Sequence, residues 1–523
     1  MILKILLGVL CAAAMAVPSK RALHMFQQNR YETGRFTGWI KDSQKANRTN
    51  MIISAVFIIA GAFIGIVLKG NLKLIGECVL CLCAAVLFIL QEQKKNYIKP
   101  LVYTARVKRQ IIVMVILSAL LIACMFIFRL ELLALCIALL MPWLLIYPMA
   151  LITSPVEAAV RNHYLNEAKQ ILADHKDLIK IGITGSYGKT STKNIMQAMI
   201  SEAYNSLMTP ASYNTPMGIT RTIREMLKPI HQVFICEMGA DHVGDITELM
   251  EFVHPTVGVV TTIGPQHMAT FGSQENITNE KMQMIELLPA DGLGIMNYDN
   301  DLIRNYKVKN NVKTVTYGIH SEDVDYRAVD IEYHRAGSRF TVVNGEERIP
   351  IETRLLGEHN IQNILSAIAC ARYLGVSWKV IQRAARTMKQ VEHRLEIKTI
   401  NGRRFIDDAF NSNPSGSAMA LEVLSTMPAR RLIVTPGMID LGKIQDETNR
   451  EFGRKMKGKA DTVVLVGKNQ TQPIYEGLKE TGFDMDQVVV FDTVREALAF
   501  VYASTTPEDT ILLENDLPDA FNH

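Results

Sequence analysis

A short stretch in the middle of the chain has the composition of a phosphate-binding loop. The motif GSYGKT, residues 185–190, follows an apolar run and opens a stretch with helical spacing, which is the context such a loop requires. Backbone N–H groups at a helix start face phosphates, the lysine neutralises phosphate charge, and the threonine hydroxyl can bind Mg²⁺. The usual pattern has a glycine five positions before Gly188, where this chain has Ile183. The predicted nucleotide contacts are Gly185, Ser186, Gly188, Lys189, Thr190 and Ser191.

Two side chains suited to metal binding follow neighbouring apolar runs. Glu237 lies near the end of run 231–240, and His267 follows run 256–264. Ligands of parallel α/β sheets bind beyond the carboxyl ends of the strands. A carboxylate and an imidazole there could complete a metal site beside the phosphates. Taken alone, the glutamate also suits a helix cap and the histidine an ordinary loop.

These residues are carried by alternating strand and helix signals that begin near residue 156. Apolar runs at 177–185, 231–240, 256–264 and 292–299 end in glycine or polar residues, and helical stretches separate them. Strands that alternate with helices predict a parallel sheet covered on both faces. We therefore expect a phosphate-loop domain of the α/β class at residues 156–390.

A second α/β unit is predicted from residue 391 to residue 523. Its expected helices lie at 415–426 and from 445 onward. Its expected strands are 403–410, 430–438, 461–467, 487–492 and 510–516. The predicted architecture is therefore a group of N-terminal transmembrane helices, a parallel-sheet ATPase domain and a Rossmann-like C-terminal domain.

Residues 1–155 are predicted to form the transmembrane domain. Four of its apolar runs approach or exceed the ~18–20 residues that cross a bilayer. The first run is shorter, and "AAAMA" would suit a signal-peptide cleavage site. Because no rich basic segment precedes it and further runs follow, a retained span is favoured. The five runs are 2–17, 51–68, 74–90, 111–128 and 132–152.

The distribution of basic residues predicts an orientation. Lysine and arginine concentrate in the segments 18–50 and 91–110, which the positive-inside rule places in the cytoplasm. Five spans then put the N-terminus outside and the catalytic domains in the cytoplasm, where ATP is. The expected location is the cell membrane, with several passes. The net charge of +4 is small for 523 residues and gives no case for nucleic-acid binding.

The short glycine spacing of residues 184–190 resembles the distinctive phosphate loop of the Mur ligases. The resemblance continues in order through Glu237, His267 and the motifs FGSQENITNEK, MNYDND, LLGEHNIQNILSA, HRLE and FIDDAFNSNPSG. It spans about residues 181–442. The motifs GADHVGDI and IDDAFNSNP are most similar to the branch that adds D-alanyl-D-alanine to the muramoyl tripeptide.

The resemblance implies an ATP-dependent amide ligase. ATP would convert a substrate carboxylate to an acyl phosphate, which the amine of an amino acid or short peptide then attacks. Thr190 and Glu237 would hold one Mg²⁺ and His267 a second, so that two ions clamp the reacting groups. Lys281 falls where the family has a lysine carbamylated by CO₂, which would make it a metal ligand. Lys189, His267 and Lys281 are the expected catalytic residues.

Further nucleotide contacts are implied by the same resemblance. Asn297 and Asn363 fall where the family contacts the base or ribose of ATP. Arg394 and Asp408, from the last domain, would close over the nucleotide. Such closure excludes water from an acyl phosphate that water would hydrolyse.

The chain also departs from the family pattern. Only about 25 residues separate the last apolar run from the phosphate loop, too few for the UDP-sugar domain of the cell-wall enzymes. His393 replaces a glycine, and the C-terminal "LLENDLPDAFNH" has Glu514 and Asp516 where a Lys-Gly-Ser type of loop is expected. These acids would repel a carboxylate and attract an amine. Because the five apolar runs take the place of the UDP-sugar domain, we expect a membrane-linked acceptor carboxylate, such as a lipid-bound peptide or a growing polymer.

Three functions fit these observations. The first is a membrane-anchored ligase of peptidoglycan or other envelope peptides. The second is a synthase of the poly-γ-glutamate type, whose phosphate loop is usually more divergent. The third is a non-catalytic scaffold or transporter-linked ATPase, against which the intact Lys189, Glu237 and Lys281 argue. Phosphate release that requires an amine co-substrate separates a ligase from an ATPase.

Overall fold

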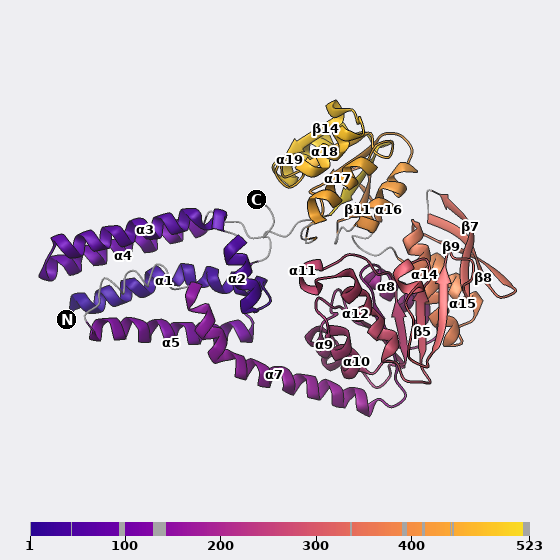
Figure 1. Ribbon diagram of the computed structural model, residues 1–523, viewed down its shortest axis with the longest axis horizontal. Helices are drawn as coiled ribbons and strands as arrows, with labels where there is room; N and C mark the ends of the chain where they lie inside the picture. Colours follow the sequence, from indigo (N-terminus) through magenta and orange to yellow (C-terminus); the bar gives the residue numbers. More distant parts are fainter. Residues whose placement is uncertain are drawn as a thin grey trace. The chain divides into compact units, whose positions relative to one another are not determined.

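The computed structural model describes residues 2–42, 44–93, 100–128, 143–334, 337–389, 395–409, 414–439, 441 and 444–515. The chain divides into two compact units, Met1–His163 and Tyr164–His523. Helices alone make up the described part of the first unit, whereas the second unit contains two sheets with helices around them (Figure 1).

The first unit packs its helices around a core of apolar side chains. Helix α1 contacts α4 and α5, and α3 contacts α4. Leu7, Cys11, Phe26 and Cys81 are among the fully buried residues of this core. The helices are α1 (Ile2–Gln28), α2 (Thr33–Asp42), α3 (Gln44–Val67), α4 (Gly70–Gln93), α5 (Ala105–Ile127) and α7 (Ile146–Asp174), which continues into the second unit.

Within the described residues, three helices are long and apolar enough to cross a membrane. They are Ile2–Gln28, Gly70–Gln93 and Ala105–Cys124. The run predicted at 51–68 falls in α3, and Ala55–Val67 is the shorter apolar helix found among its described residues. Much of the run at 132–152 lies outside the described residues. Five spans and their orientation therefore stay predictions.

The first sheet of the second unit is parallel at one side and antiparallel at the other. Over the described residues its order is β2-β3-β1-β4-β5-β6-β7-β8-β9. Pairs from β2 to β7 are parallel, and β7-β8-β9 are antiparallel. The strands are β1 (Ile179–Thr184), β2 (Ser206–Met208), β3 (Val233–Glu237), β4 (Val257–Val260), β5 (Leu293–Asn297), β6 (Lys313–Gly318), β7 (Tyr326–His334), β8 (Gly337–Asn344) and β9 (Glu347–Thr353).

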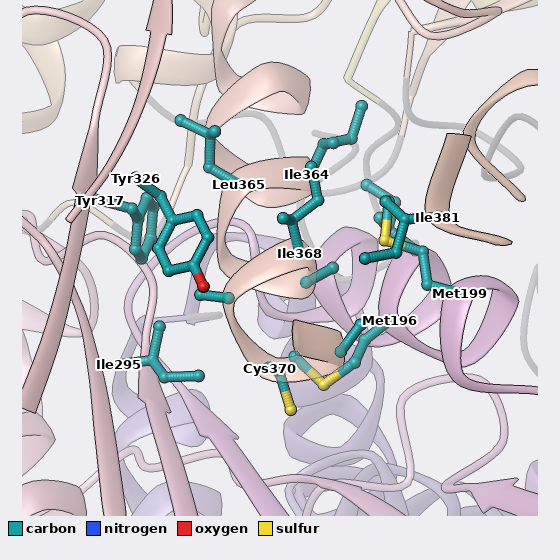
Figure 2. Close-up of a cluster of buried hydrophobic side chains, with 14 of the residues drawn as sticks. Met196, Met199, Ile295, Tyr317, Tyr326, Ile364, Leu365, Ile368, Cys370 and Ile381 are labelled. Carbon is teal, nitrogen blue, oxygen red and sulfur yellow. The ribbon is translucent and has the colours of Figure 1, made fainter. Parts of the chain in front are cut away.

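Helices cover both faces of this sheet. One face packs Ile295 and Tyr317 against Met196 of α8 and Ile368 of α14 (Figure 2). The other face packs apolar side chains from α9, α10 and α12. The helices are α8 (Lys189–Ile200), α9 (Pro216–Met226), α10 (Asp245–Val253), α11 (Met268–Phe271), α12 (Gln274–Glu286), α13 (Asp301–Arg304), α14 (Glu358–Tyr373) and α15 (Trp378–Thr387).

One glycine explains how closely α12 approaches the centre of the sheet. A β-carbon on Gly182 of β1 would lie 2.9 Å from the sulfur of Met284 in α12, closer than non-bonded atoms pack. Because strand side chains alternate between faces, Ile181 and Ile183 instead enter the core on the α8 side.

The second sheet is mostly parallel and has the order β10-β11-β15-β12-β13-β14 in the described residues. Only β10–β11 is an antiparallel pair there. Its strands are β10 (Glu396–Ile400), β11 (Arg403–Asp408), β12 (Arg431–Thr435), β13 (Thr462–Val466), β14 (Val488–Phe491) and β15 (Thr510–Glu514). The helices are α16 (Pro414–Ser425), α17 (Gln445–Lys455), α18 (Gln472–Glu480), η2 (Met485–Gln487) and α19 (Val494–Ser504). The predicted α/β class with parallel sheets is confirmed.

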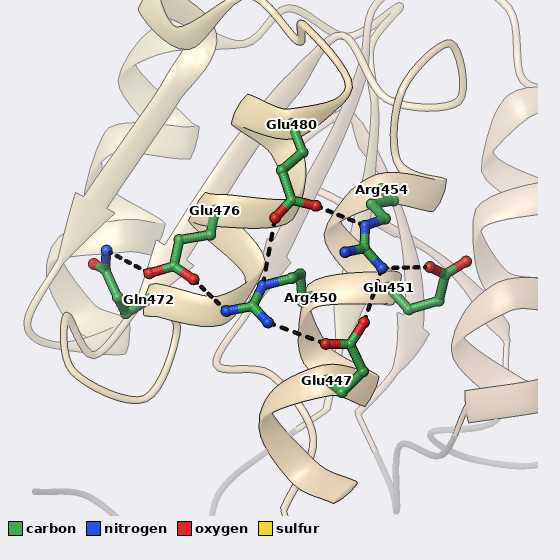
Figure 3. Close-up of polar contacts among 7 residues, drawn as sticks. All are labelled: Glu447, Arg450, Glu451, Arg454, Gln472, Glu476 and Glu480. Atoms are coloured by element: carbon green, nitrogen blue, oxygen red, sulfur yellow. Dashed lines mark hydrogen bonds and ion pairs between the residues drawn. The ribbon is translucent and has the colours of Figure 1, made fainter.

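Charged side chains join α17 and α18 on the surface of this domain (Figure 3). Arg450 contacts Glu447 at 3.0 Å and Glu476 at 2.5 Å. Arg454 contacts Glu447 at 2.9 Å and Glu480 at 2.7 Å. Two arginines that each bridge several carboxylates form a network, which contributes more than isolated surface pairs do.

Candidate active site

The phosphate loop lies between the end of β1 and the start of α8, as predicted. Gly185 has φ +148° and Gly188 has φ +84°, values that favour glycine. A β-carbon on Gly185 would lie 2.1 Å from Thr261 Oγ1, and one on Gly188 would lie 2.9 Å from Asn363 Oδ1. The short spacing therefore places both glycines where the neighbouring strand end and α14 leave no room for a side chain.

The segment after β4 holds the loop in place. The Ser186 amide donates to Thr262 O at 2.7 Å, and its hydroxyl donates to Gly264 O at 2.9 Å. The Tyr187 hydroxyl donates to Pro265 O at 2.6 Å. Ser186 is buried, so its hydrogen bonds to the protein fix the position of the loop. Ser191 is buried as well.

Lys189 and the start of α8 carry the positive charge of the loop. The Lys189 ammonium donates to Gly185 O at 2.6 Å and to Ser186 O at 3.1 Å. The side chain thus folds back over the loop, where a phosphate would offer stronger acceptors. Helix N-termini favour anions through their unpaired N–H groups and their dipole.

Glu237 at the end of β3 meets Thr190 from α8, and these are the two residues that the family resemblance implies for one Mg²⁺. The Thr190 hydroxyl donates to Glu237 Oε2 at 3.0 Å, and Asn214 Nδ2 donates to Oε1 at 3.1 Å. Burial alone would raise the pKa of Glu237, but the charges of Lys193 and Lys189 and the hydrogen bonds outweigh it and lower the pKa. Glu237 is therefore an ionised carboxylate in a buried place.

Lys193 was not predicted as a site residue. It lies one turn beyond Lys189 on α8 and is fully buried. Its ammonium lies 3.0 Å from Glu237 Oε2 and donates to Ala211 O at 2.5 Å. Asn214 was missed as well, because neither residue belongs to a motif that points to a site.

His267 and Lys281 meet the same segment that follows β3. His267 Nε2 lies 3.2 Å from Asp241 Oδ1. The Lys281 ammonium donates to Ala240 O at 3.1 Å and lies 5.6 Å from the centre of the Phe271 ring. Asp241, which contacts His267, is a further residue that the sequence did not single out.

Lys281 has the most perturbed lysine pKa of the site. Burial, and next the charge of Lys189, lower it from 10.5 to about 7, although Glu280, Asp241 and Asp245 oppose the shift. Glu280 is itself engaged, since it accepts the N–H groups of Gly244 at 2.8 Å and Ile246 at 2.6 Å. About half of the Lys281 amines are therefore neutral at pH 7.

The predicted nucleotide contacts from later in the chain lie on different elements. Asn297 ends β5 and donates to Thr262 Oγ1 at 3.4 Å. Asn363 of α14 accepts from Thr192 Oγ1 at 3.0 Å, and its buried Nδ2 has no hydrogen-bond partner among the described residues. Asp408 ends β11 and accepts from the Leu395 amide at 3.1 Å. Arg394, His393 and Asp516 lie outside the described residues.

The donors fit one Mg²⁺ at Thr190 and Glu237, because hydroxyl and carboxylate oxygens are the ligands that this ion prefers. No group of three His, Cys, Asp or Glu suited to a metal occurs in the described parts of the chain. Further ligands would therefore come from phosphate or water, as is usual for Mg²⁺. The ammonium of Lys281 cannot bind a metal ion, and the side chain would offer the oxygen ligands that Mg²⁺ prefers only as a carbamate.

Comparison with known proteins agrees with this architecture. A family model for the Mur ligase middle domain matches residues 183–371, and a model for the Mur ligase glutamate ligase domain matches residues 393–514. These two regions carry the two sheets in order. The chain is therefore an ATP-dependent peptide ligase built from a phosphate-loop domain and a second α/β domain. It belongs to the Mur ligase family.

Named relatives lie in one branch of this family. The UDP-N-acetylmuramoyl-tripeptide–D-alanyl-D-alanine ligase of Bacillus subtilis is 30% identical over 338 residues, which are 64% of this chain and 72% of the relative. The Escherichia coli protein of the same name is 29% identical over 55% of this chain and 64% of its own length. The chain thus spans less than two thirds of the latter.

Solved structures give the same result for the fold. MurF from Acinetobacter baumannii superposes with a TM-score of 0.63 at 25% identity, over 69% of this chain and 78% of that one. MurF from Thermotoga maritima in complex with ADP has a TM-score of 0.62 at 21% identity, over 68% and 80% of the two chains. The latter similarity concerns the fold alone.

Proposed function

We propose that this chain is a membrane-anchored ligase that uses ATP to join a carboxylate to the amine of an amino acid or short peptide in peptidoglycan synthesis. The observation that carries the proposal is the meeting of Thr190 with the ionised Glu237 directly beside the phosphate loop. Lys189 acts electrostatically on both Glu237 and Lys281. Lys189, which would bind phosphate, thus influences the charge state of both Glu237 and Lys281.

The reaction begins with activation of the acceptor. A carboxylate oxygen attacks the γ-phosphorus of ATP, the bond to the bridging oxygen breaks, and ADP leaves from an acyl phosphate. The amine then attacks the carbonyl carbon, inorganic phosphate leaves, and the nitrogen loses a proton. Lys189 and the N-terminus of α8 would hold the phosphates, and Thr190 and Glu237 would hold the Mg²⁺ that neutralises their charge.

Lys281 would become an anion before it takes part. Its neutral amine adds to CO₂ and releases a proton, which leaves a carbamate of charge −1. The lowered pKa supports this step, because only the neutral amine is a nucleophile. The carbamate and His267 would then hold a second Mg²⁺.

The substrates are inferred from the relatives and from the membrane helices. The relatives' names indicate D-alanyl-D-alanine as the amine and a muramoyl tripeptide as the acceptor. Three helices could anchor the chain in a membrane, and both family matches begin after residue 182. We infer that the acceptor is attached to a lipid or a polymer and that the catalytic domains face the cytoplasm.

A comparison of acceptors tests this proposal. The purified full-length chain is given ATP, Mg²⁺ and D-alanyl-D-alanine with either UDP-linked or lipid-linked muramoyl tripeptide. Phosphate release is recorded, and products are identified by mass. Faster ligation of the lipid-linked tripeptide is expected. Strong activity on the UDP-linked form alone would refute the lipid-linked acceptor, and phosphate release without an amine would favour an ATPase.

A further inference from the structure

The buried ammonium of Lys193 contacts Glu237, which is the expected metal ligand. Lys193 is 0% exposed, and its Nζ lies 3.0 Å from the same Glu237 oxygen that accepts the Thr190 hydroxyl. Lysine is almost never buried without a partner, and an unpaired buried charge is costly. Lys193 therefore neutralises the negative charge of Glu237 in the absence of a bound metal ion.

The charges around Glu237 do not attract a divalent cation. The carboxylate faces two ammonium groups, Lys193 in direct contact and Lys189 close enough to lower its pKa. Thr190 and Asn214, which donate hydrogen bonds to the carboxylate, are neutral. Asp241 lies against His267 instead, and Glu280 accepts two backbone N–H groups of the α10 start. The immediate surroundings of Glu237 are thus net positive.

We propose that Lys193 makes metal binding depend on the nucleotide: the free protein rejects divalent cations at Glu237, and Mg²⁺ enters only with the phosphates of ATP. The inference rests on the proposed function, since it concerns the same ATP site. Negative phosphates reverse the sign of the local charge, whereas a cation alone meets repulsion that is strong at low dielectric. Lys193 is a positioning residue, which acts on the metal through Glu237.

The contact with Ala211 ties Lys193 to the segment that carries Asn214. Ala211 has φ +43°, a conformation that residues other than glycine rarely adopt. Its carbonyl accepts from Lys193 at 2.5 Å. Because this bond and the Glu237 contact share one ammonium, Ala211 helps to hold the lysine beside the carboxylate.

Mn²⁺ binding to the full-length protein tests the proposal without measuring ligation. Free Mn²⁺ is counted by electron paramagnetic resonance at pH 7.5, with and without ADP. We expect the wild type to bind one Mn²⁺ with ADP and to bind nucleotide-free Mn²⁺ weakly. Lys193→Met should bind nucleotide-free Mn²⁺ at least about tenfold more tightly, because the repelling charge is gone.

Three further variants serve as controls. Lys193→Arg keeps the charge and should behave as the wild type, whereas Lys193→Gln should behave as Lys193→Met. Lys180→Met removes a half-buried lysine of β1 whose pKa burial also lowers, and it should change nothing. Thermal unfolding of each variant separates this effect from a loss of structure, which would lower the melting temperature without tightening Mn²⁺ binding.

The outcomes are distinct. The proposal is overturned if the wild type binds Mn²⁺ equally well with and without ADP, a result that needs no variant. It is also overturned if folded Lys193→Met and Lys193→Gln match the wild type. A wild type that binds neither ADP nor Mn²⁺–ADP contradicts the proposed ATP site itself, which is a different failure.

Discussion

The lowered pKa of Lys281 leads to a quantitative prediction about its reaction with CO₂. Burial lowers the pKa of Lys281 to about 7 from 10.5. At pH 7 about half of its amines are neutral, against roughly 0.03% for a lysine with the ordinary value. Its reactive fraction is therefore about a thousandfold larger than that of a surface lysine, and carbamylation near neutral pH should select Lys281.

The assay is ¹³C NMR of the full-length protein in ¹³C-bicarbonate. We expect one carbamate resonance from a lysine side chain at pH 7.5, absent from Lys281→Met and retained in Lys180→Met, besides that of the α-amino group, whose ordinary pKa of about 8 also allows carbamylation. The direction of the pH dependence follows from the lowered pKa. Nearly all Lys281 amines are neutral well above pH 7, and only about a tenth are neutral at pH 6. The resonance should fall steeply over that interval at constant dissolved CO₂.

Two results would refute this reasoning. One is the absence of any carbamate resonance between pH 7 and 8 in the folded wild type. The other is a Lys281→Met spectrum identical to that of the wild type, which would assign the reactive side chain to a different residue.

Three other perturbations have expected outcomes. Gly185→Ala should abolish ADP binding by calorimetry and lower the melting temperature, because its β-carbon would lie 2.1 Å from Thr261 Oγ1; Gly38→Ala, with no atom within 4 Å, should change neither. The pKa of Glu237 is lowered from 4.5, so its ionised form adds stability that is present above pH 4.5 and is lost as the pH falls through the lowered value. The melting temperature of the wild type should therefore drop more steeply than that of Glu237→Gln on acidification, and parallel curves would contradict this. Arg454→Met removes the contacts with Glu447 and Glu480 (Figure 3) and should lower the melting temperature at low salt, with a difference that disappears near 1 M NaCl, where the Debye length is about 3 Å.

The buried parallel strands could be predicted from the sequence. Apolar runs that end in glycine or a polar residue correspond to β1, β3, β4 and β5, and the runs of the last domain correspond to β11 through β15. Strands buried on both faces read as continuous apolar runs. The prediction omitted β2, which has three residues, β6, whose first residues are exposed, and β7–β10, which form antiparallel pairs and are partly exposed. Such strands lack a continuous apolar signal.

The site was predictable where a side chain follows a strand end. Thr190 and Glu237 meet because the carboxyl ends of β1 and β3 are adjacent in the parallel sheet. Lys193 was missed because a lysine four residues after Lys189 resembles a solvated helix residue. That spacing puts both on one helix face, but burial against Glu237 depends on β3, which is forty residues further along the chain. Tertiary contacts of this kind leave no local pattern.

Activation of a carboxylate by ATP can be followed by the transfer of a carboxylate oxygen to inorganic phosphate. The acceptor is prepared with ¹⁸O in its carboxylate and incubated with the protein, ATP, Mg²⁺ and D-alanyl-D-alanine. An acyl phosphate leaves one carboxylate oxygen on phosphorus when the amine attacks the carbonyl carbon. One ¹⁸O is therefore expected in the released inorganic phosphate for each amide formed. Amide formation with unlabelled phosphate, or with the label in AMP, would contradict it.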